Sequence, residues 1–119
     1  MKTEVYCTLA IEGTHCWSNC PFPEVGYLRD PHRHMFHIKA YKEVTHADRD
    51  VEFIMLKHRI DAYIKNKYTE KAGNDGFSHL LCVFGSMSCE MIAEELINEF
   101  NLSRCEVNED NENGAIVTA

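Results

Sequence analysis

The 119-residue sequence lacks two features, a long apolar run and a cluster of basic residues. A membrane-spanning helix needs about 20 consecutive apolar residues, so we expect no membrane partner. Binding to nucleic acid needs a cationic surface, whereas this chain has a formal net charge of −7 and scattered lysines and arginines. We therefore expect no nucleic-acid partner, although one local pocket can still bind a small anion.

The N-terminus also lacks the apolar block of a signal peptide, because residues 1–13 alternate between apolar and polar types. Disulfide staples are not required either, since hydrophobic residues make up 45% of the chain and can form a core. We expect most of the six cysteines to be reduced and the protein to be cytoplasmic. The length suits a single domain over residues 1–119.

Two early segments show the alternating pattern of half-buried strands. Residues 3–12 alternate throughout, and residues 32–45 place His32 and His34 on the same face. The segment between them, residues 13–31, contains all three prolines of the chain. We predict a long irregular loop there, of a kind that is often functional.

Later segments complete the fold. Helical spacing of apolar residues predicts a helix in 50–68, with Asp48 or Asp50 at its start, and a second helix after Ser88.

Residues 103–110 and 113–119 predict two strands around a turn at 110–114, with Asn113 and Gly114 as turn residues. The run 79–84 fits either a strand or a helix. The order strand, strand, helix, helix, strand, strand predicts an α+β fold, with a four-stranded antiparallel sheet and both helices on one face.

The histidines suggest a metal site. His32 and His34 project together from one strand, and a hairpin of the first two strands would bring His15 near them. Zinc needs three or four N, S or O ligands at about 2.0–2.3 Å. We predict zinc bound by His15, His32 and His34. The alternative is that these are ordinary polar residues of a strand.

Two loop cysteines offer a competing metal site. Cys16 and Cys20 could form a closed site with His32 and His34. Structural zinc modules, however, usually carry histidines three to five residues apart on a helix. A His-x-His pair on a strand fits an open catalytic site better.

Five segments follow one another in a recognisable order. These are His15 after the first strand, His32-Arg33-His34 in the second, "EFIMLK" at the first helix, "MSCEMIA" at the second helix, and "CEVNED", which contains Glu109. The pattern resembles the tunnelling-fold pterin enzymes, the 6-pyruvoyl-tetrahydropterin synthase and 6-carboxy-tetrahydropterin synthase family. In that family, a histidine follows the first strand and His-Gly-His opens the second. The first helix begins with Asp-Phe followed by Leu-Lys, and the second begins with Pro-Thr-x-Glu-Asn-Leu-Ala. The third strand ends in a glutamate that binds the ligand. The resemblance covers nearly the whole chain.

This resemblance implies a zinc-dependent lyase that acts on a reduced-pterin precursor or a related purine-type nucleotide. It also implies a homo-oligomer, a hexamer of two trimers whose sheets close into a barrel. Glu109 would bind the guanidine-like edge of the pterin or purine ligand. Arg29, close to the predicted zinc ligands, is a candidate for binding a phosphate or carboxylate.

The chain departs from the family at the catalytic positions. Leu28 stands where the family has its catalytic cysteine, and Asp75 with His79 is the nearest match to the family's Asp-His dyad. The candidate general bases are Cys16, Cys20 and the pair of His79 with Asp75. The alternative function is a catalytically altered protein that binds a pterin or purine without the standard synthase reaction.

Overall fold

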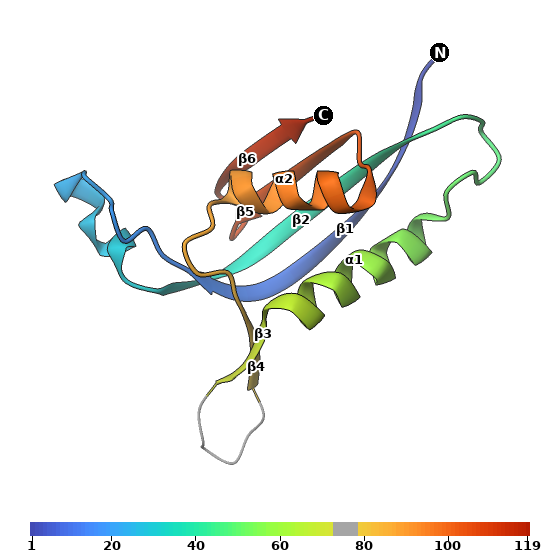
Figure 1. Cartoon of the computed structure of the whole chain (residues 1–119). Helices are drawn as coiled ribbons and strands as arrows, with labels where there is room; N and C mark the ends of the chain where they lie inside the picture. Colours follow the sequence, from blue (N-terminus) through green and yellow to red (C-terminus); the bar gives the residue numbers. More distant parts are fainter. Residues whose placement is uncertain (73–78) are drawn as a thin grey trace.

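The computed structural model describes residues 1–72 and 79–119, with the backbone alone at 70–72, 79 and 80. This part of the chain forms one twisted sheet with two α-helices packed on one face (Figure 1). The elements in chain order are β1 (Thr3–His15), the 3₁₀ helix η1 (Pro23–Arg29), β2 (His32–Val44), α1 (Phe53–Tyr68), β3 (Thr69–Ala72), β4 (His79–Val83), α2 (Cys89–Phe100), β5 (Arg104–Glu109) and β6 (Asn113–Thr118).

The sheet has the strand order β3-β4-β1-β2-β5-β6. β1 and β2 form a long antiparallel hairpin in which Thr3 pairs with Val44 and His15 pairs with His32. β5 and β6 continue the antiparallel arrangement, whereas β4 runs parallel to β1. The predicted α+β fold is confirmed. The short β3–β4 hairpin adds two strands beyond the four expected, because the run at 79–84 is too short for periodicity to place it.

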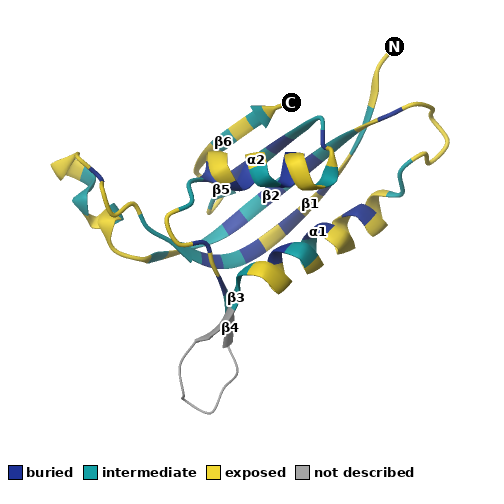
Figure 2. Cartoon of the chain, in the orientation of Figure 1, coloured by how far each residue is buried: buried dark blue, intermediate teal, exposed yellow. Residues whose placement is uncertain are grey.

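The core lies between the sheet and the two helices. Buried and exposed residues alternate along β1 and β2 (Figure 2), as the sequence pattern predicts. Phe36, Ile38 and Ala40 of β2 are fully buried, and the helices cover this face. His32 and His34 lie on the same face of β2 as these buried residues and precede them in the strand. The apolar core therefore ends next to the predicted metal site.

A carboxylate of α2 joins the two helices. Glu95 accepts hydrogen bonds from the hydroxyl groups of Tyr68, at 2.6 Å, and Tyr63, at 3.1 Å, and forms an ion pair with Lys67 at 3.2 Å. Partial burial alone would raise the pKa of Glu95, but these three partners together outweigh it and lower the pKa. The opposite effect holds for Tyr68, where burial and the bond to Glu95 raise the pKa to about 12.

The helices begin at side-chain caps. Glu52 accepts hydrogen bonds from two backbone amides in the first turn of α1, and Ser88 caps α2 as predicted. The prediction of Asp48 or Asp50 at the start of α1 is wrong. The helix begins at Phe53, too late for either aspartate, and Asp50 instead accepts hydrogen bonds from Thr45.

The β5–β6 turn lies at residues 110–112, before Asn113 and Gly114, which already belong to β6. Asp110 and Asn111 have φ angles of 58° and 60°. Asp and Asn adopt this left-handed conformation more readily than most residues. The predicted turn therefore exists, but its turn residues are Asp110 and Asn111.

The segment that connects β4 to α2 runs against the end of β1. Gly13 permits this close approach, because a Cβ atom there would lie 2.7 Å from the ring of Phe84. The amide of Phe84 donates a hydrogen bond of 2.9 Å to the carbonyl of Thr14. This pairing places the backbone of Met87 beside His15.

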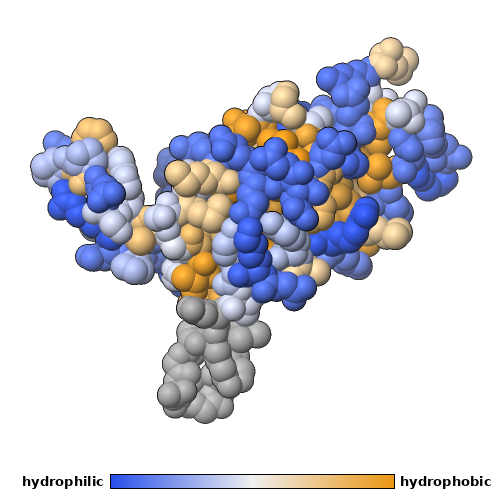
Figure 3. All heavy atoms as spheres, viewed as in Figure 1, coloured by the Kyte–Doolittle hydropathy of each residue, from blue (hydrophilic) through white to orange (hydrophobic). Residues whose placement is uncertain are grey.

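Hydrophilic residues cover much of the surface seen in Figure 3, in keeping with the net charge of −7. Hydrophobic atoms show in patches between them. Across residues 1–72 and 79–119, none of the helices is both long enough and apolar enough to cross a membrane.

Candidate metal centre

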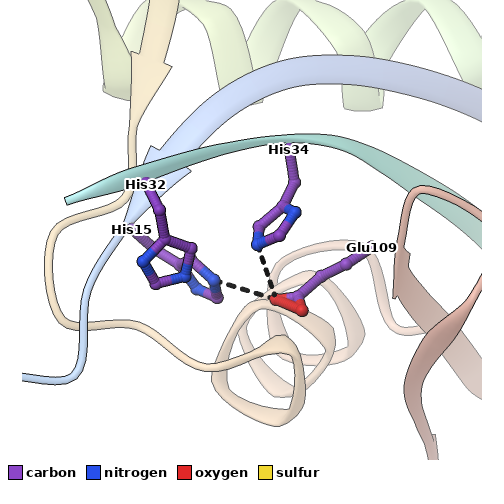
Figure 4. Close-up of side chains that lie close together, drawn as sticks. All are labelled: His15, His32, His34 and Glu109. Atoms are coloured by element: carbon purple, nitrogen blue, oxygen red, sulfur yellow. Dashed lines mark ion pairs between the residues drawn. The ribbon is translucent and has the colours of Figure 1, made fainter. Parts of the chain in front are cut away.

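Four side chains converge where β1, β2 and β5 meet. His15 ends β1, His32 and His34 come from β2, and Glu109 ends β5 (Figure 4). One potential ligand atom of each residue lies within 4.8 Å of the others, and all four residues are partly buried. The structure thus brings together the three histidines of the predicted zinc site and adds Glu109 as a fourth group.

Hydrogen bonds fix the orientation of each imidazole ring. Nδ1 of His15 lies 2.9 Å from the carbonyl of Met87, and Nδ1 of His32 lies 2.8 Å from the carbonyl of Asp30. Nδ1 of His34 lies 2.7 Å from the carboxylate of Asp110. Carbonyl and carboxylate oxygens only accept, so each Nδ1 carries a proton and donates it. In a neutral ring, Nε2 then offers the lone pair that a metal binds.

The Nε2 atoms have too few partners. Those of His32 and His34 are buried and form no hydrogen bond, and an unsatisfied buried polar atom costs about 1–3 kcal/mol. Nε2 of His15 lies 2.8 Å from Oε2 of Glu109, and Nε2 of His34 lies 3.6 Å from the same oxygen. A cation among the four groups would give all of them a partner, so this donor set fits a metal.

Asp110 positions His34 through the backbone of the next residue. The backbone amide of Asp110 donates a hydrogen bond of 2.8 Å to the carbonyl of Met35. The carboxylate of Asp110 accepts a hydrogen bond of 2.9 Å from the amide of Met35. The same carboxylate accepts the Nδ1 proton of His34. The bond from Met35, followed by that from His34, lowers the pKa of Asp110 below its usual value. The carboxylate therefore remains ionised beside the imidazole at neutral pH.

A cavity of about 490 Å³ adjoins the centre. Ligand pockets typically measure about 300–1,000 Å³, so one bicyclic ring system fits. The cavity wall includes His15, His32, Glu109, Glu90, the apolar residues Trp17, Leu28, Met87 and Met91, and the thiols Cys16 and Cys89.

The thiols near the cavity differ in exposure. Cys16 is partly exposed on the wall, whereas Cys89 is buried. Burial, followed by the negative charges of Glu109 and Glu90, raises the pKa of Cys89 to about 12, so it stays a neutral thiol. Cys20 is not on the wall. Only 3% of it is exposed, and its thiol donates to two loop carbonyls.

Comparisons with known proteins place the fold. No family model and no curated protein matches this sequence. Among solved structures, the chain is similar to 6-pyruvoyltetrahydropterin synthase from Plasmodium vivax, in a variant whose catalytic glutamate is replaced by alanine. The match covers 100% of this chain and 98% of that chain, with a TM-score of 0.63 and 12% sequence identity. This chain has the fold of 6-pyruvoyltetrahydropterin synthase. The tunnelling fold implied by the sequence resemblance is thus confirmed.

The remaining predicted site residues are Arg29, His79 and Asp75. Arg29 is not on the cavity wall. Its Nε donates a hydrogen bond of 2.9 Å to the carbonyl of Cys20 within the loop. His79 begins β4, where its backbone pairs with Ala72, and its side chain is outside the description. Asp75 lies outside the described residues. Within the described part of the chain, the potential metal ligands include no cysteine, unlike the alternative Cys₂His₂ site.

Sequence reasoning missed several residues at this centre, among them Asp110, Cys89 and Glu90. Asp110 holds His34, and Cys89 and Glu90 line the cavity. The position of Asp110 directly after Glu109 was an available signal, because a carboxylate at a strand end can orient a histidine of the neighbouring strand. Glu90 matches the glutamate of the family's second-helix motif, but that match assigned it no role at the site, and Cys89 gave no comparable signal.

Proposed function

We propose that this protein is a zinc-dependent lyase that acts on a reduced-pterin precursor or a related purine-type nucleotide. The principal support is the cluster of three histidines and Glu109 beside a cavity of about 490 Å³, in the fold of a pterin synthase. Imidazole nitrogens with a carboxylate oxygen suit zinc. When bound, zinc supplies Lewis-acid polarisation of a substrate hydroxyl or carbonyl and eases loss of a neighbouring proton.

The cavity wall supplies recognition. Glu109 accepts two hydrogen bonds from the guanidine-like edge of the ring, a charge-assisted interaction about twice as strong as a neutral one. The apolar side chains of Trp17, Leu28 and Met91 contact the faces of the ring and exclude water from it. A flat bicyclic ring with a polar edge therefore matches both the carboxylate of Glu109 and the apolar side chains of the cavity wall.

Cys16 is our first candidate for the general base. It is a partly exposed thiol on the cavity wall, whereas Cys20 is buried and Cys89 remains protonated. Glu90 on the same wall is the second candidate, because the similar solved synthase has a catalytic glutamate. His79 with Asp75 remains the third candidate.

Leu28 favours a second candidate function. It lies on the cavity wall and has no titratable group, at the position where the sequence resemblance expects the catalytic thiol. A protein with the same cavity and metal but without an effective base would bind the pterin or purine and turn it over slowly. A general base typically contributes about 10²–10⁴-fold to the rate, so losing it would affect turnover far more than binding.

Metal analysis of purified protein tests the proposal first. We expect one zinc per chain in the wild type and in His37→Ala, a control in the same strand, and loss of most metal in His34→Ala. Absence of metal from the wild type, or full metal content in His34→Ala, would contradict the proposal.

Turnover of dihydroneopterin triphosphate and calorimetry with neopterin then separate the two functions. If Cys16 is the base, Cys16→Ser lowers turnover by about 10²–10⁴-fold and leaves zinc content unchanged. The control Cys20→Ser changes neither turnover nor zinc content. Binding of neopterin by the wild type without turnover would establish the second function.

A further inference from the structure

Glu109 and His15 are too close for two hydrogen-bond acceptors. Oε2 of Glu109 lies 2.8 Å from Nε2 of His15, whose Nδ1 already donates its proton to the Met87 carbonyl. A neutral His15 therefore presents a lone pair to the carboxylate. A proton shared by the ring and the carboxylate, or a cation held between the two residues, must therefore lie at this contact.

A second proton would satisfy only this one contact. The buried Nε2 atoms of His32 and His34 would still lack a partner, because 3.6 Å from His34 to Glu109 is beyond hydrogen-bond range. A divalent cation satisfies all four groups at once. In a tetrahedral zinc site with bonds of about 2.0–2.1 Å, ligand atoms lie about 3.4 Å apart. The four atoms here lie within 4.8 Å of one another, so small side-chain movements suffice.

We propose that Glu109 is the fourth metal ligand in the ligand-free protein and that it leaves the metal when a ligand enters the cavity. This inference rests on the proposed zinc site and adds a closed state to it. Zinc sites with four protein ligands have no open position, whereas catalytic sites keep one. Movement of the Glu109 carboxylate would thus convert a closed, four-ligand zinc site into an open site, and back.

The position of Glu109 allows this movement. Its side chain is 24% exposed and forms part of the cavity wall as well as contacting His15. The histidines, in contrast, are each held by a hydrogen bond through Nδ1. Among the four groups, Glu109 is therefore the one that can turn away, and its carboxylate is then free to accept hydrogen bonds from the ligand.

This two-state role narrows the ligand class. The ligand must bring an oxygen that competes with a carboxylate for the metal, such as a hydroxyl or carbonyl on a short side chain. It must also carry an edge with two N–H donors for the freed Glu109. Neopterin has both features, whereas pterin itself lacks the side-chain hydroxyl groups.

Cobalt substitution tests the inference, because the visible spectrum of Co²⁺ reports the number and type of its ligands. We compare the wild type with Glu109→Gln and with Glu112→Gln, an exposed neighbour in the β5–β6 turn. We expect Glu109→Gln to weaken cobalt binding by at least about 10-fold, the lower limit for loss of even an outer partner, and to change the spectrum. Glu112→Gln should match the wild type. Neopterin should change the wild-type spectrum, and pterin should change it much less.

Two outcomes separate this inference from the proposed function. If Glu109→Gln has the wild-type spectrum and affinity while His34→Ala loses the metal, Glu109 is not a ligand and the three-histidine site stands. If His34→Ala retains full metal content, the proposed site fails together with the inference. Circular dichroism of each variant excludes a loss of fold as the cause.

Discussion

Asp110 and His34 are joined by a hydrogen bond of 2.7 Å from Nδ1 of the imidazole to Oδ2 of the carboxylate. This contact sets which nitrogen of His34 faces the centre. Removing such an outer partner typically costs about 10–100-fold in metal affinity. We therefore expect Asp110→Ala to weaken zinc binding by that factor, measured by competition with a chromophoric chelator.

Asp48→Ala provides the control, since Asp48 is exposed, accepts a hydrogen bond from Arg49, and follows the end of β2 opposite to His32 and His34. It should leave zinc affinity unchanged. An Asp110→Ala protein with wild-type zinc affinity would show that the Asp110 contact does not organise the site.

Glu95 should contribute stability that depends on pH. The pKa of Glu95 is lower in the folded protein than its ordinary value, so its contribution is present above the unfolded-state pKa of about 4.3. The contribution disappears as the pH falls through the folded-state pKa. We expect Glu95→Gln to lower the free energy of unfolding by about 1–3 kcal/mol near pH 7 and by less near pH 3.

Urea denaturation at both pH values measures this difference. Glu94→Gln, an exposed neighbour in α2, serves as the control. An equal loss for Glu95→Gln at pH 7 and pH 3 would mean that the carboxylate charge does not stabilise the contact between the helices.

Cys16 should be the first cysteine to react with iodoacetamide. It is partly exposed, whereas the other five cysteines are buried, and burial raises the pKa of the Cys89 and Cys105 thiols to about 12. Alkylation favours an accessible thiol with thiolate character. Peptide mass spectrometry at limiting reagent should find Cys16 modified first, and neopterin should slow this reaction. Earlier modification of Cys20 would contradict the burial of the loop thiol.

Trp17 should report ligand binding. It is the single tryptophan of the chain and lies on the cavity wall. Neopterin in the cavity should change its fluorescence in a saturable way, because the surroundings of the indole change on binding. Trp17→Phe should abolish the signal, while calorimetry still detects binding. A wild-type emission that stays constant although calorimetry shows binding would place the ligand elsewhere.

The sheet edges should drive assembly. Among the strands of residues 1–72 and 79–119, β3 and β6 each have a neighbour on one side only. Unpaired edges favour pairing with another chain. Closure of several sheets into a barrel would remove the edges. The sequence resemblance implies a hexamer of two trimers, and we expect this assembly by analytical ultracentrifugation. A monomer at micromolar concentration would refute this prediction.

The strand periodicity was sufficient to predict the histidine pair. His32 and His34 share a face because side-chain direction repeats every second residue, and the β1–β2 register places His15 opposite His32. Glu109 was predicted to face a ligand, but its contact with His15 depends on how β5 aligns with β2. That alignment arises from long-range pairing, which no local pattern encodes.

Other features could not be predicted for local physical reasons. The role of Asp110 depends on a left-handed backbone that brings its carboxylate back to Met35 and His34. The different surroundings of Cys16 and Cys20 arise from the way η1 folds over the second thiol. Composition and spacing alone do not show that Cys16 is partly exposed and Cys20 is buried.

The four groups of the centre come from the first, second and last parts of the chain. His15 and Glu109 are separated by 94 positions in the sequence (109 − 15), and β5, which carries Glu109, is synthesised after β1 and β2. A nascent chain on the ribosome therefore holds the histidines before it has the carboxylate. A metal site of the three histidines alone could thus form before β5 is synthesised, whereas a site that includes Glu109 requires closure of this long loop.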